Sequence, residues 1–393
     1  MNGETRLLTA CRRQPVDRTP VWFMRQAGRC LAEYRELRKR YDILTLAKTP
    51  ELSTQVTLMP VERFGVDGAV MFADIMLPLE AMGVPFEIQP DVGPIIHSPV
   101  RTAADVERLR VVDGEEATPY VMEAIRLIRR ELAGGRGGQG VGSQSPGGET
   151  GGRAVGSQAP KGGRGGWGVG SQAPKGGKAA LIGFSGAPFT LACYMIEGRP
   201  SRDYAKAKGL MFSEPQTWHA LMEKVTEMVV RYLRAQIAAG VQVVQLFDSW
   251  VGILSPQDYE RYSLPYSRRI FEALEDSGVP RIHFGTGAAS LLELMASAGP
   301  DVMSVDWRVP LDSAWARIGY DKSIQGNLDP VLILAPWERL EVGMRDVLRR
   351  AAGRPGHIFN LGHGVLPDTD PEQLARLVRA VHEATAVQEG SSA

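Results

Sequence analysis

The feature that most constrains the fold is a repeated alternation of short apolar runs with amphipathic helical segments. Eight runs are rich in β-forming residues and have the length of buried strands. They occupy residues 21–24, 69–73, 180–184, 241–247, 281–284, 302–305, 323–325 and 358–361. Eight strands that alternate with helices are typical of a (β/α)8 TIM barrel, an α/β fold that we predict here as a single domain.

Three of the intervening helices have clear start or stop signals. The segment 214–239 carries apolar residues at three- and four-residue spacings, and Gly240 ends it. A second helix begins at Ser255-Pro256, an N-cap followed by proline at the first helical position. A third covers 371 to about 385 and precedes a polar tail, 387–393, that we expect to be flexible.

One segment, 133–178, differs from the rest of the chain in composition. It is rich in Gly, Ser, Gln, Pro and basic residues, and Val-Gly-Ser-Gln occurs three times, starting at 141, 155 and 169. So few apolar residues cannot offset the entropy of ordering the backbone, which predicts disorder. A basic tether for nucleic acid or a partner is one interpretation. We favour an insert tolerated in a surface loop, between a helix and the third strand, on the N-terminal face of the barrel.

The overall composition excludes several classes of protein. Lys+Arg and Asp+Glu are both 45, so no global field attracts nucleic acid or an anionic membrane. No run reaches the ~18 apolar residues of a membrane span. Cys11, Cys30 and Cys193 are odd in number and lack metal-ligand spacing, which predicts free thiols in a reducing compartment. We therefore expect a cytoplasmic protein without a metal site.

Polar groups or glycines follow every predicted strand. In strand order these are Arg25-Gln26-Ala27-Gly28-Arg29, Asp74, Ser185-Gly186 with Tyr194 further on, Asp248-Ser249-Trp250, Gly285-Thr286-Gly287, Asp306-Trp307, Gly326-Asn327 and Gly362-His363-Gly364. The C-terminal ends of barrel strands meet on one face, where catalytic groups lie. The pattern therefore predicts one site assembled from distant parts of the chain.

Four residue types in this set can carry chemistry. Arg25 and Arg29 present planar guanidinium groups that suit carboxylates or phosphates. Asp74 lies in an apolar run, where a carboxylate is either satisfied by backbone donors or poised for catalysis. His363 is a candidate between two glycines, whereas the residues around Tyr194 favour a core tyrosine at the start of a helix. The glycine turns fit neither a phosphate loop nor a dinucleotide fingerprint, so we expect no cofactor.

The motifs together resemble those of the uroporphyrinogen decarboxylase family. They are Met24-Arg25-Gln26-Ala27-Gly28-Arg29, Phe72-Ala73-Asp74-Ile75, Gly186-Ala187-Pro188-Phe189-Thr190, Phe247-Asp248-Ser249-Trp250, His283-Phe284-Gly285-Thr286-Gly287, Gln325-Gly326-Asn327-Leu328-Asp329-Pro330 and Asn360-Leu361-Gly362-His363-Gly364. The resemblance covers the chain outside the insert. It implies a cofactor-free barrel, usually a homodimer, that removes carbon dioxide from the four acetate side chains of uroporphyrinogen III. The product is coproporphyrinogen III, in haem and tetrapyrrole biosynthesis.

The resemblance also implies roles for individual residues. Arg25 and Arg29 match carboxylate-binding arginines, and Asp74 matches an essential aspartate that contacts the pyrrole N–H groups. Tyr194 matches an active-site tyrosine near that aspartate. The remaining predicted substrate contacts are Gln26, Ala27, Gly28, Phe247, Ser249 and His363, with Arg25, Asp74, Tyr194 and His363 as the catalytic set.

Decarboxylation of a pyrrole acetate requires an electron sink, which protonation of the ring provides. An ionised Asp74 would accept from the pyrrole N–H groups and stabilise the developing cation. The proton donor stays open among His363, Tyr194, a bound water and the arginines.

Two departures and two rival functions bear on this interpretation. Cys30 stands where the family often has tyrosine, and Trp250 stands where some members have histidine. Methyltransferases on the same barrel bind zinc through a His-x-Cys pair and a distant cysteine. Here that position reads His283-Phe284-Gly285 and no cysteine follows Cys193, so the zinc site cannot form. A carrier that binds porphyrinogens without turnover is the second rival, and the Arg25, Asp74 and His363 set argues against it.

Overall fold

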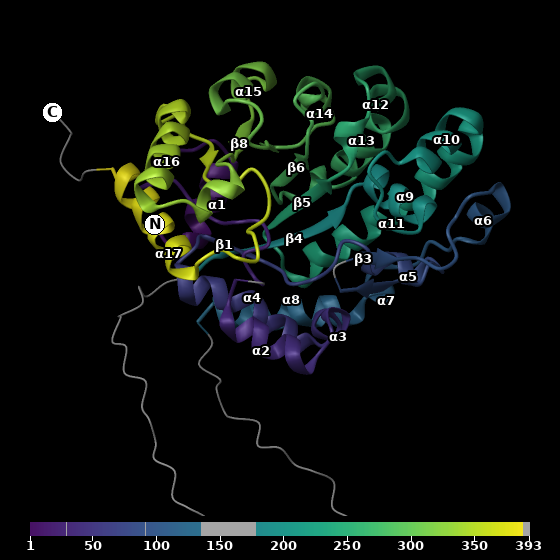
Figure 1. Cartoon of the computed structure of the whole chain (residues 1–393), viewed down its shortest axis with the longest axis horizontal. Coiled ribbons are helices and arrows are strands. Elements are labelled where there is room, and N and C mark those ends of the chain that lie inside the picture. The colour runs from purple at the N-terminus through teal and green to yellow at the C-terminus, as the bar shows by residue number, and fades with distance from the viewer. Residues whose placement is uncertain (29, 91, 135–177, 388–393) are drawn as a thin grey trace, which may run out of the picture.

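A curled sheet of seven parallel strands forms the centre of the molecule (Figure 1). The computed structural model describes residues 1–28, 30–90, 92–134 and 178–387. The sheet strands are β1 (Gly68–Val70), β4 (Ala180–Gly186), β5 (Val243–Asp248), β6 (Arg281–Gly285), β7 (Val302–Ser304), β8 (Ser323–Gln325) and β9 (His357–Ile358). They pair in that order, each parallel to the next. Seven of the eight predicted strands are thereby confirmed, with small shifts of their ends.

Buried polar side chains show how strongly the sheet curls. Gln325 on β8 donates from Nε2 to Oε1 of Gln245 on β5 at 3.1 Å and to Oγ of Ser304 on β7 at 2.9 Å. In a flat sheet, β5 and β8 would lie about 14 Å apart, three strand spacings. Direct contact between their side chains therefore requires both strands to face a common interior.

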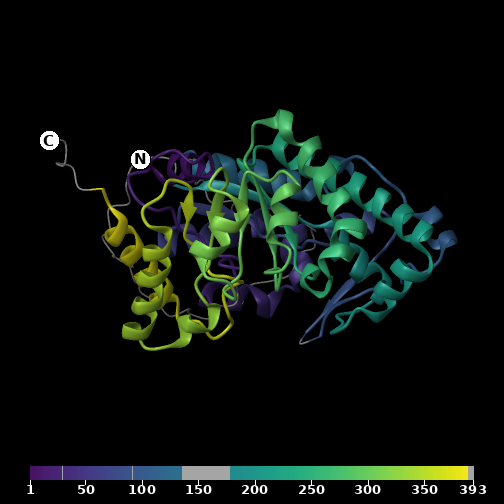
Figure 2. The same cartoon turned by 90° about the horizontal axis from the view of Figure 1, so that it is seen from above.

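Helices cover the outer face of the curled sheet (Figures 1 and 2). They are α1 (Gly3–Cys11), α2 (Ala32–Arg40), α3 (Ile43–Lys48), α4 (Pro50–Phe64), α5 (Leu77–Ala81), α6 (Ala103–Arg108), α7 (Gly114–Ala117), α8 (Pro119–Leu132), α9 (Pro188–Glu197), α10 (Ala205–Ser213), α11 (Pro215–Ala239), α12 (Pro256–Tyr262), α13 (Leu264–Ala273), α14 (Leu292–Ser297), α15 (Leu311–Ile318), α16 (Trp337–Ala351) and α17 (Pro371–Thr385). Short 3-10 helices are η1 (Val251–Ile253), η2 (Glu275–Ser277) and η3 (Pro330–Leu334).

The helix signals in the sequence are confirmed. Gly240 ends α11 in the left-handed conformation, and the Ser255 side chain caps α12 by accepting from the Asp258 N–H.

An antiparallel hairpin, β2 (Glu87–Gln89) and β3 (Gly93–Ile95), was not predicted and extends past the helices in Figure 2. Among the described residues, no helix has the length and apolar character needed to cross a membrane. All three cysteines are free, as predicted.

The predicted strand 21–24 is wrong. Only Val21 forms a bridge, with Phe359 just beyond β9, and the chain then leaves the extended conformation. The reason is that side chains take the next backbone donors. The Phe23 N–H donates to Oε1 of Gln26 at 2.9 Å, and the Met24 N–H donates to Oδ1 of Asn360 at 3.2 Å.

Residues 20–22 nevertheless contact both edges of the sheet. On one side, the Phe359 N–H donates to the Pro20 carbonyl at 2.9 Å. On the other, the Asp67 N–H donates to the Val21 carbonyl at 2.8 Å, one residue before β1. This segment therefore lies between β9 and β1.

Asp67 fixes this arrangement through its buried carboxylate. Its Oδ1 accepts from Nη1 of the buried Arg6 on α1 at 2.5 Å. Its Oδ2 accepts from the Val21 N–H at 2.8 Å and lies 2.8 Å from Nε2 of His382 on α17. One carboxylate thus joins the first helix, the last helix and the segment between the sheet edges.

The ends of the described chain around the insert meet at the N-terminal side of β4. The Lys178 N–H donates to the carbonyl of Leu132, the last residue of α8, at 3.4 Å. The predicted insert 133–178 therefore leaves and re-enters at the predicted face, although 135–177 lie outside the described residues, as does most of the 387–393 tail. Elsewhere, the Met1 amino group and the Val387 N–H both bond Asp17, each at 2.9 Å.

Candidate active site

The C-terminal ends of the parallel strands carry the residues predicted from the sequence. Arg25 follows the segment 20–22, Asp74 follows β1, and Tyr194 lies on α9, which begins directly after β4. Ser249 follows β5 and His363 follows β9. Arg29 lies outside the described residues.

Arg25 occupies a turn whose shape is set by its neighbours. Its φ of 59° lies in the left-handed region, which is uncommon for a residue with a side chain and is often retained at functional sites. Buried Gln26 donates from Nε2 to the Gly68 carbonyl on β1 at 2.8 Å, in addition to accepting from Phe23. The Gln26 side chain therefore holds the turn against β1, with Ala27 and Gly28 also buried.

Asp74 is half-buried and has one local partner. Its Oδ1 accepts from the Met76 N–H at 2.9 Å. Burial raises the pKa of Asp74, whereas the Met76 N–H and the charge of Arg25 lower it. The carboxylate therefore lies within the electrostatic reach of Arg25, with its ionised form held by few donors.

Tyr194 shares this environment. Burial and the nearby Asp74 carboxylate raise the pKa of Tyr194 to about 12, and Arg25 opposes that shift. Its ring packs edge-on against Trp250, with centroids 5.8 Å apart. At neutral pH, Tyr194 is therefore a protonated phenol within the electrostatic reach of Asp74.

His363 lies between two glycines because both sides of its turn are crowded. A Cβ on Gly362 would collide with the backbone of Trp307, and a Cβ on Gly364 would collide with side-chain carbons of Arg25. Burial, Arg25 and Arg308 lower the pKa of His363 to about 4. The imidazole is therefore neutral at pH 7, with one N–H to donate.

An aromatic wall joins His363 to the β5 side of the site. The Phe284 ring lies 6.2 Å from the His363 ring and 5.9 Å from that of Phe247. Phe247 also packs edge-on against Phe184 at 5.5 Å. Phe247 and Ser249 are both half-buried and reach the same edge of the sheet.

Two further charged residues at this edge were not assigned roles from the sequence. Fully buried Asp248 accepts from Oγ1 of Thr190 at 2.9 Å, and burial raises its pKa to about 7. Arg308 follows Asp306-Trp307 beyond β7 and pairs with Asp306. An arginine two residues after a strand-end aspartate was the available signal for Arg308, whereas the burial of Asp248 depends on tertiary packing.

The described residues contain no group of three or more His, Cys, Asp or Glu side chains that could hold a metal ion. His283, the first residue of the His283-Phe284-Gly285 motif, is fully buried. Its ring packs against Phe271 of α13, with centroids 5.1 Å apart, and therefore faces the helix layer.

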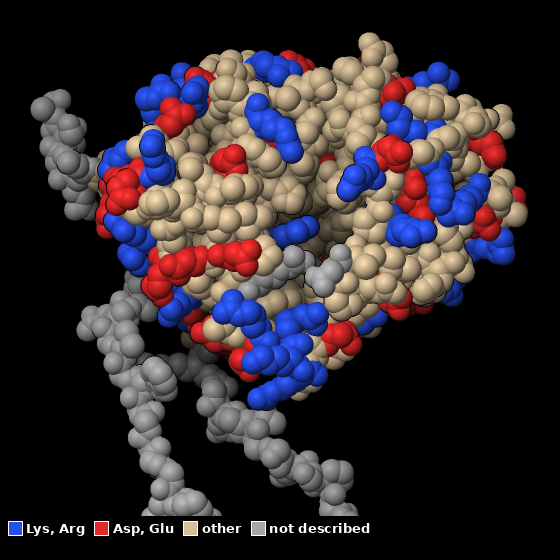
Figure 3. All heavy atoms as spheres, viewed as in Figure 1, with Lys and Arg blue, Asp and Glu red and all other residues tan. Residues whose placement is uncertain are grey.

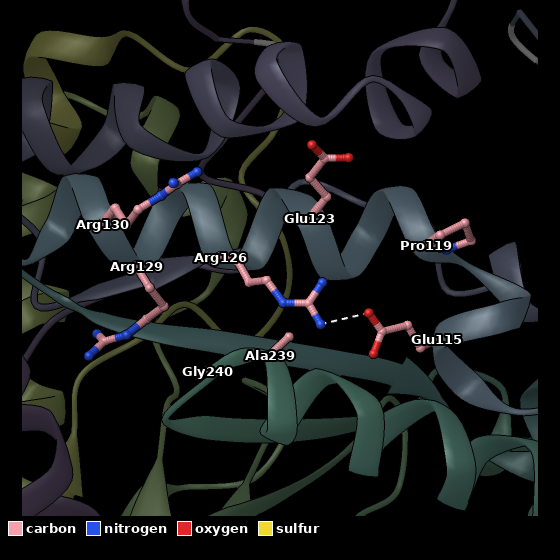
Figure 4. A pocket seen from close by; sticks show the side chains of 8 residues that line it. All are labelled: Glu115, Pro119, Glu123, Arg126, Arg129, Arg130, Ala239 and Gly240. Atoms are coloured by element: carbon pink, nitrogen blue, oxygen red, sulfur yellow. Dashed lines mark hydrogen bonds and ion pairs between the residues drawn. The ribbon is translucent and has the colours of Figure 1, made fainter. Parts of the chain in front are cut away.

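Two hollows lie on different parts of the molecule. Figure 3 shows one near the middle of the viewed face, with Lys and Arg side chains at its rim and more of them gathered over α2. Another, of about 630 Å³, lies between α8 and the end of α11 and contains the Arg126–Glu115 pair (Figure 4). It adjoins Gly240, before β5, and thus lies at the N-terminal ends of the strands, away from the predicted site.

Comparison with known proteins identifies the family of the chain. A family model described as uroporphyrinogen decarboxylase (URO-D) matches residues 2–141 and 172–384, and the unmatched 142–171 fall inside the insert. The uroporphyrinogen decarboxylase of Carboxydothermus hydrogenoformans is 50% identical over 376 residues, covering 96% of this chain and 95% of that protein. That of Sorangium cellulosum is 51% identical over 377 residues, with the same two coverages.

A solved methyltransferase from Methanosarcina mazei has a similar fold, with a TM-score of 0.69 and 20% identity over 98% of this chain and 99% of that one. At this identity the likeness concerns the fold alone. The curated relatives, by contrast, share about half of their residues with this chain over nearly its whole length, and the family model matches most of the sequence. The chain therefore belongs to the uroporphyrinogen decarboxylase family.

Proposed function

We propose that the protein decarboxylates the four acetate side chains of uroporphyrinogen III to give coproporphyrinogen III, in haem and tetrapyrrole biosynthesis. The observation that carries this proposal is the electrostatic grouping of Arg25, Asp74, Tyr194 and His363. The charge of Arg25 shifts the pKa of the other three residues, which come from three different strand ends. The names of the curated relatives support the same activity.

We infer that the sheet closes into a single-domain (β/α)8 barrel, with residues 20–22 in place of the eighth strand. The hydrogen bonds from Phe359 to Pro20 and from Asp67 to Val21 support this closure. A cytoplasmic homodimer is the assembly that the family resemblance implies.

Substrate binding in this proposal depends on local positive charge. The substrate carries eight carboxylates, and the chain has no net charge. Arg25 and Arg29 bind carboxylates, and Gln26, Ala27 and Gly28 shape their turn. The basic last turn of α2, with Arg38, Lys39 and Arg40, adds to the positive surface that attracts a polyanion.

In the reaction, a proton adds to the pyrrole carbon next to the acetate and makes the ring cationic. The bond to the carboxylate then breaks, its electron pair moves into the ring, and carbon dioxide leaves. A second proton converts the exocyclic carbon to a methyl group, and the ring carbon loses its proton. Each cycle therefore consumes one proton and releases one carbon dioxide.

Asp74 stabilises the cation by accepting from the pyrrole N–H in a partly desolvated site. Tyr194 and His363 are both neutral at pH 7, so either can relay a proton from water to the ring, taking up one proton as it gives another. Phe247 and Ser249 are further substrate contacts at the end of β5. This division of roles requires Asp74 to be ionised, and Arg25 favours that form.

Turnover without additions tests the function directly. We expect purified protein, treated with chelator and given no metal or cofactor, to convert uroporphyrinogen to coproporphyrinogen under anaerobic conditions. Chromatography of the oxidised products separates porphyrins with eight to four carboxylates. A folded preparation that leaves uroporphyrinogen unchanged would overturn the proposed function.

Deletion of residues 135–176 is expected to leave kcat/KM within a few-fold of the full chain. Leu132 and Lys178 are already hydrogen-bonded, so residues 133, 134 and 177 suffice for a short turn between them. The deletion point also lies at the strand ends opposite Asp74. Activity and the unfolding midpoint are the measurements, and a same-length scrambled insert is the control. Failure of the shortened chain to fold would show that the insert is structural.

A further inference from the structure

A second positively charged side chain stands at the site, on the opposite side of His363 from Arg25. Arg308 lies four residues beyond the end of β7, and its side chain is 47% exposed. The Trp307 backbone packs against Gly362, whereas Arg25 packs against Gly364. The turns that carry Arg308 and Arg25 therefore contact the two sides of the His363 turn.

The Arg308 guanidinium is held in place before any ligand binds. Nη1 donates to Oδ2 of Asp306 at 2.6 Å, and the Arg308 N–H donates to Oδ1 at 3.0 Å. The guanidinium carbon lies 4.0 Å from the centroid of the Trp307 ring. A stacked and hydrogen-bonded arginine loses little side-chain entropy when it binds an anion.

Asp306 is itself fixed by the neighbouring loops. Its Oδ2 accepts from the Gly287 N–H after β6 at 2.6 Å. Nδ2 of Asn327, after β8, donates to the carbonyls of Asp306 and Val309 at 2.8 and 2.7 Å. Three strand ends therefore determine where the Arg308 side chain points.

The Asp306–Arg308 pair still presents positive charge to the site. Among the described residues, only Nη1 of the guanidinium has a hydrogen-bond partner, which leaves Nε and Nη2 to donate. At His363, the pKa-lowering effect of Arg308 exceeds the raising effect of Asp306. The buried carboxylate thus orients the guanidinium without cancelling its field on that side.

We propose that Arg308 binds a carboxylate at the periphery of the substrate, one that is not reacting while it is held there. The proposal rests on the proposed function, because a porphyrinogen carries carboxylates around its whole rim. Arg308 is more exposed than the half-buried Asp74 and His363, which places it beside an outward-pointing group. A fork of two N–H donors can bind both oxygens of such a carboxylate. The bound carboxylate belongs either to a propionate or to an acetate that has not yet been decarboxylated.

Arg308→Gln tests this role, with Arg317→Gln as the matched control. Arg317 belongs to the next helix, α15, and pairs with Glu293 on the outer surface. We expect Arg308→Gln to raise KM for uroporphyrinogen about tenfold, since one charge-assisted contact is lost at a partly exposed position. We expect kcat to change less than twofold, and Arg308→Lys to restore part of the affinity. Arg317→Gln should match the wild type.

Inhibition by coproporphyrinogen, which retains only the propionates, distinguishes the two sources of the carboxylate. If Arg308 holds a propionate, Ki for coproporphyrinogen rises in Arg308→Gln by the same factor as KM. If it holds an acetate, only KM rises. Unchanged KM in both Arg308 variants would overturn the proposal, as would a fall in kcat at constant KM. Neither result would affect the proposed function, which fails only if the wild type is inactive.

Discussion

Replacement of Asp74 by asparagine is expected to lower kcat for uroporphyrinogen by about 10²- to 10³-fold or more, the usual cost of removing a preorganised electrostatic group. Asparagine keeps the size of the side chain but cannot offer a negative charge to the pyrrole N–H groups. Because burial opposes ionisation of Asp74, the folded protein should not lose stability when the charge is removed. Loss of turnover with an unchanged unfolding midpoint would identify Asp74 as catalytic.

Asp321→Asn controls for the chemical change, since the Asp321 side chain is 73% exposed and far from the strand ends that carry the site. The pH profile gives a second measurement. Asp74 must be ionised for turnover, and burial raises its pKa. As the pH is lowered, kcat/KM should therefore begin to fall at a higher pH than the pKa of an exposed aspartate, about 3.9, would give. Near-normal turnover in Asp74→Asn would contradict the electrostatic role.

Asp67→Ala is expected to lower the free energy of unfolding by about 3 kcal/mol, because it leaves Arg6 without its buried partner. Both side chains are only 3% exposed. The same change removes the acceptor for the Val21 N–H and the contact with His382. Asp17 still pairs with Arg6 at 2.7 Å, which is why the expected loss is at the lower end of the range for broken buried pairs.

The denaturant midpoint measures this effect, and Asp276→Ala is the control. Asp276 pairs with Arg234, but its side chain is 72% exposed, so its removal should cost well under about 1 kcal/mol. Equal stability of the two variants would show that Asp67 does not hold the sheet edges together. Activity per folded molecule should persist in Asp67→Ala, because Asp67 lies at the N-terminal end of β1 and Asp74 beyond its C-terminal end.

Local sequence patterns were sufficient for helices, whose hydrogen bonds lie within the element, and for buried parallel strands, which form short and largely apolar runs. The β4 and β5 runs and the caps of α11 and α12 are examples. The strand 21–24 could not be judged in this way, because the donor of Met24 is taken by Asn360, 336 residues away. An apolar run indicates burial, but it does not identify which backbone groups a distant side chain will occupy.

In the candidate site, too, some residues could be predicted from local sequence patterns and others depend on distant contacts. The rule that chemistry follows parallel strands brought Arg25, Asp74, Tyr194 and His363 to one edge of the sheet. It did not show that Gln26 has a structural role different from that of its neighbours in the motif. The Gln26 side chain accepts from the Phe23 N–H and donates to the Gly68 carbonyl. Nor did it indicate Arg308, whose orientation depends on Asp306 and thereby on loops after β6 and β8.

The hydrogen bond between Leu132 and Lys178 has a consequence for how the gene could be rearranged. Met1 and Val387 both bond Asp17, so the two ends of the described chain lie close to one residue. The strands of the main sheet follow one another in sequence order, and the insert lies in the connection between β1 and β4. A circularly permuted polypeptide, starting at Lys178 and joined through a linker after Val387 to Met1, would preserve every strand pairing.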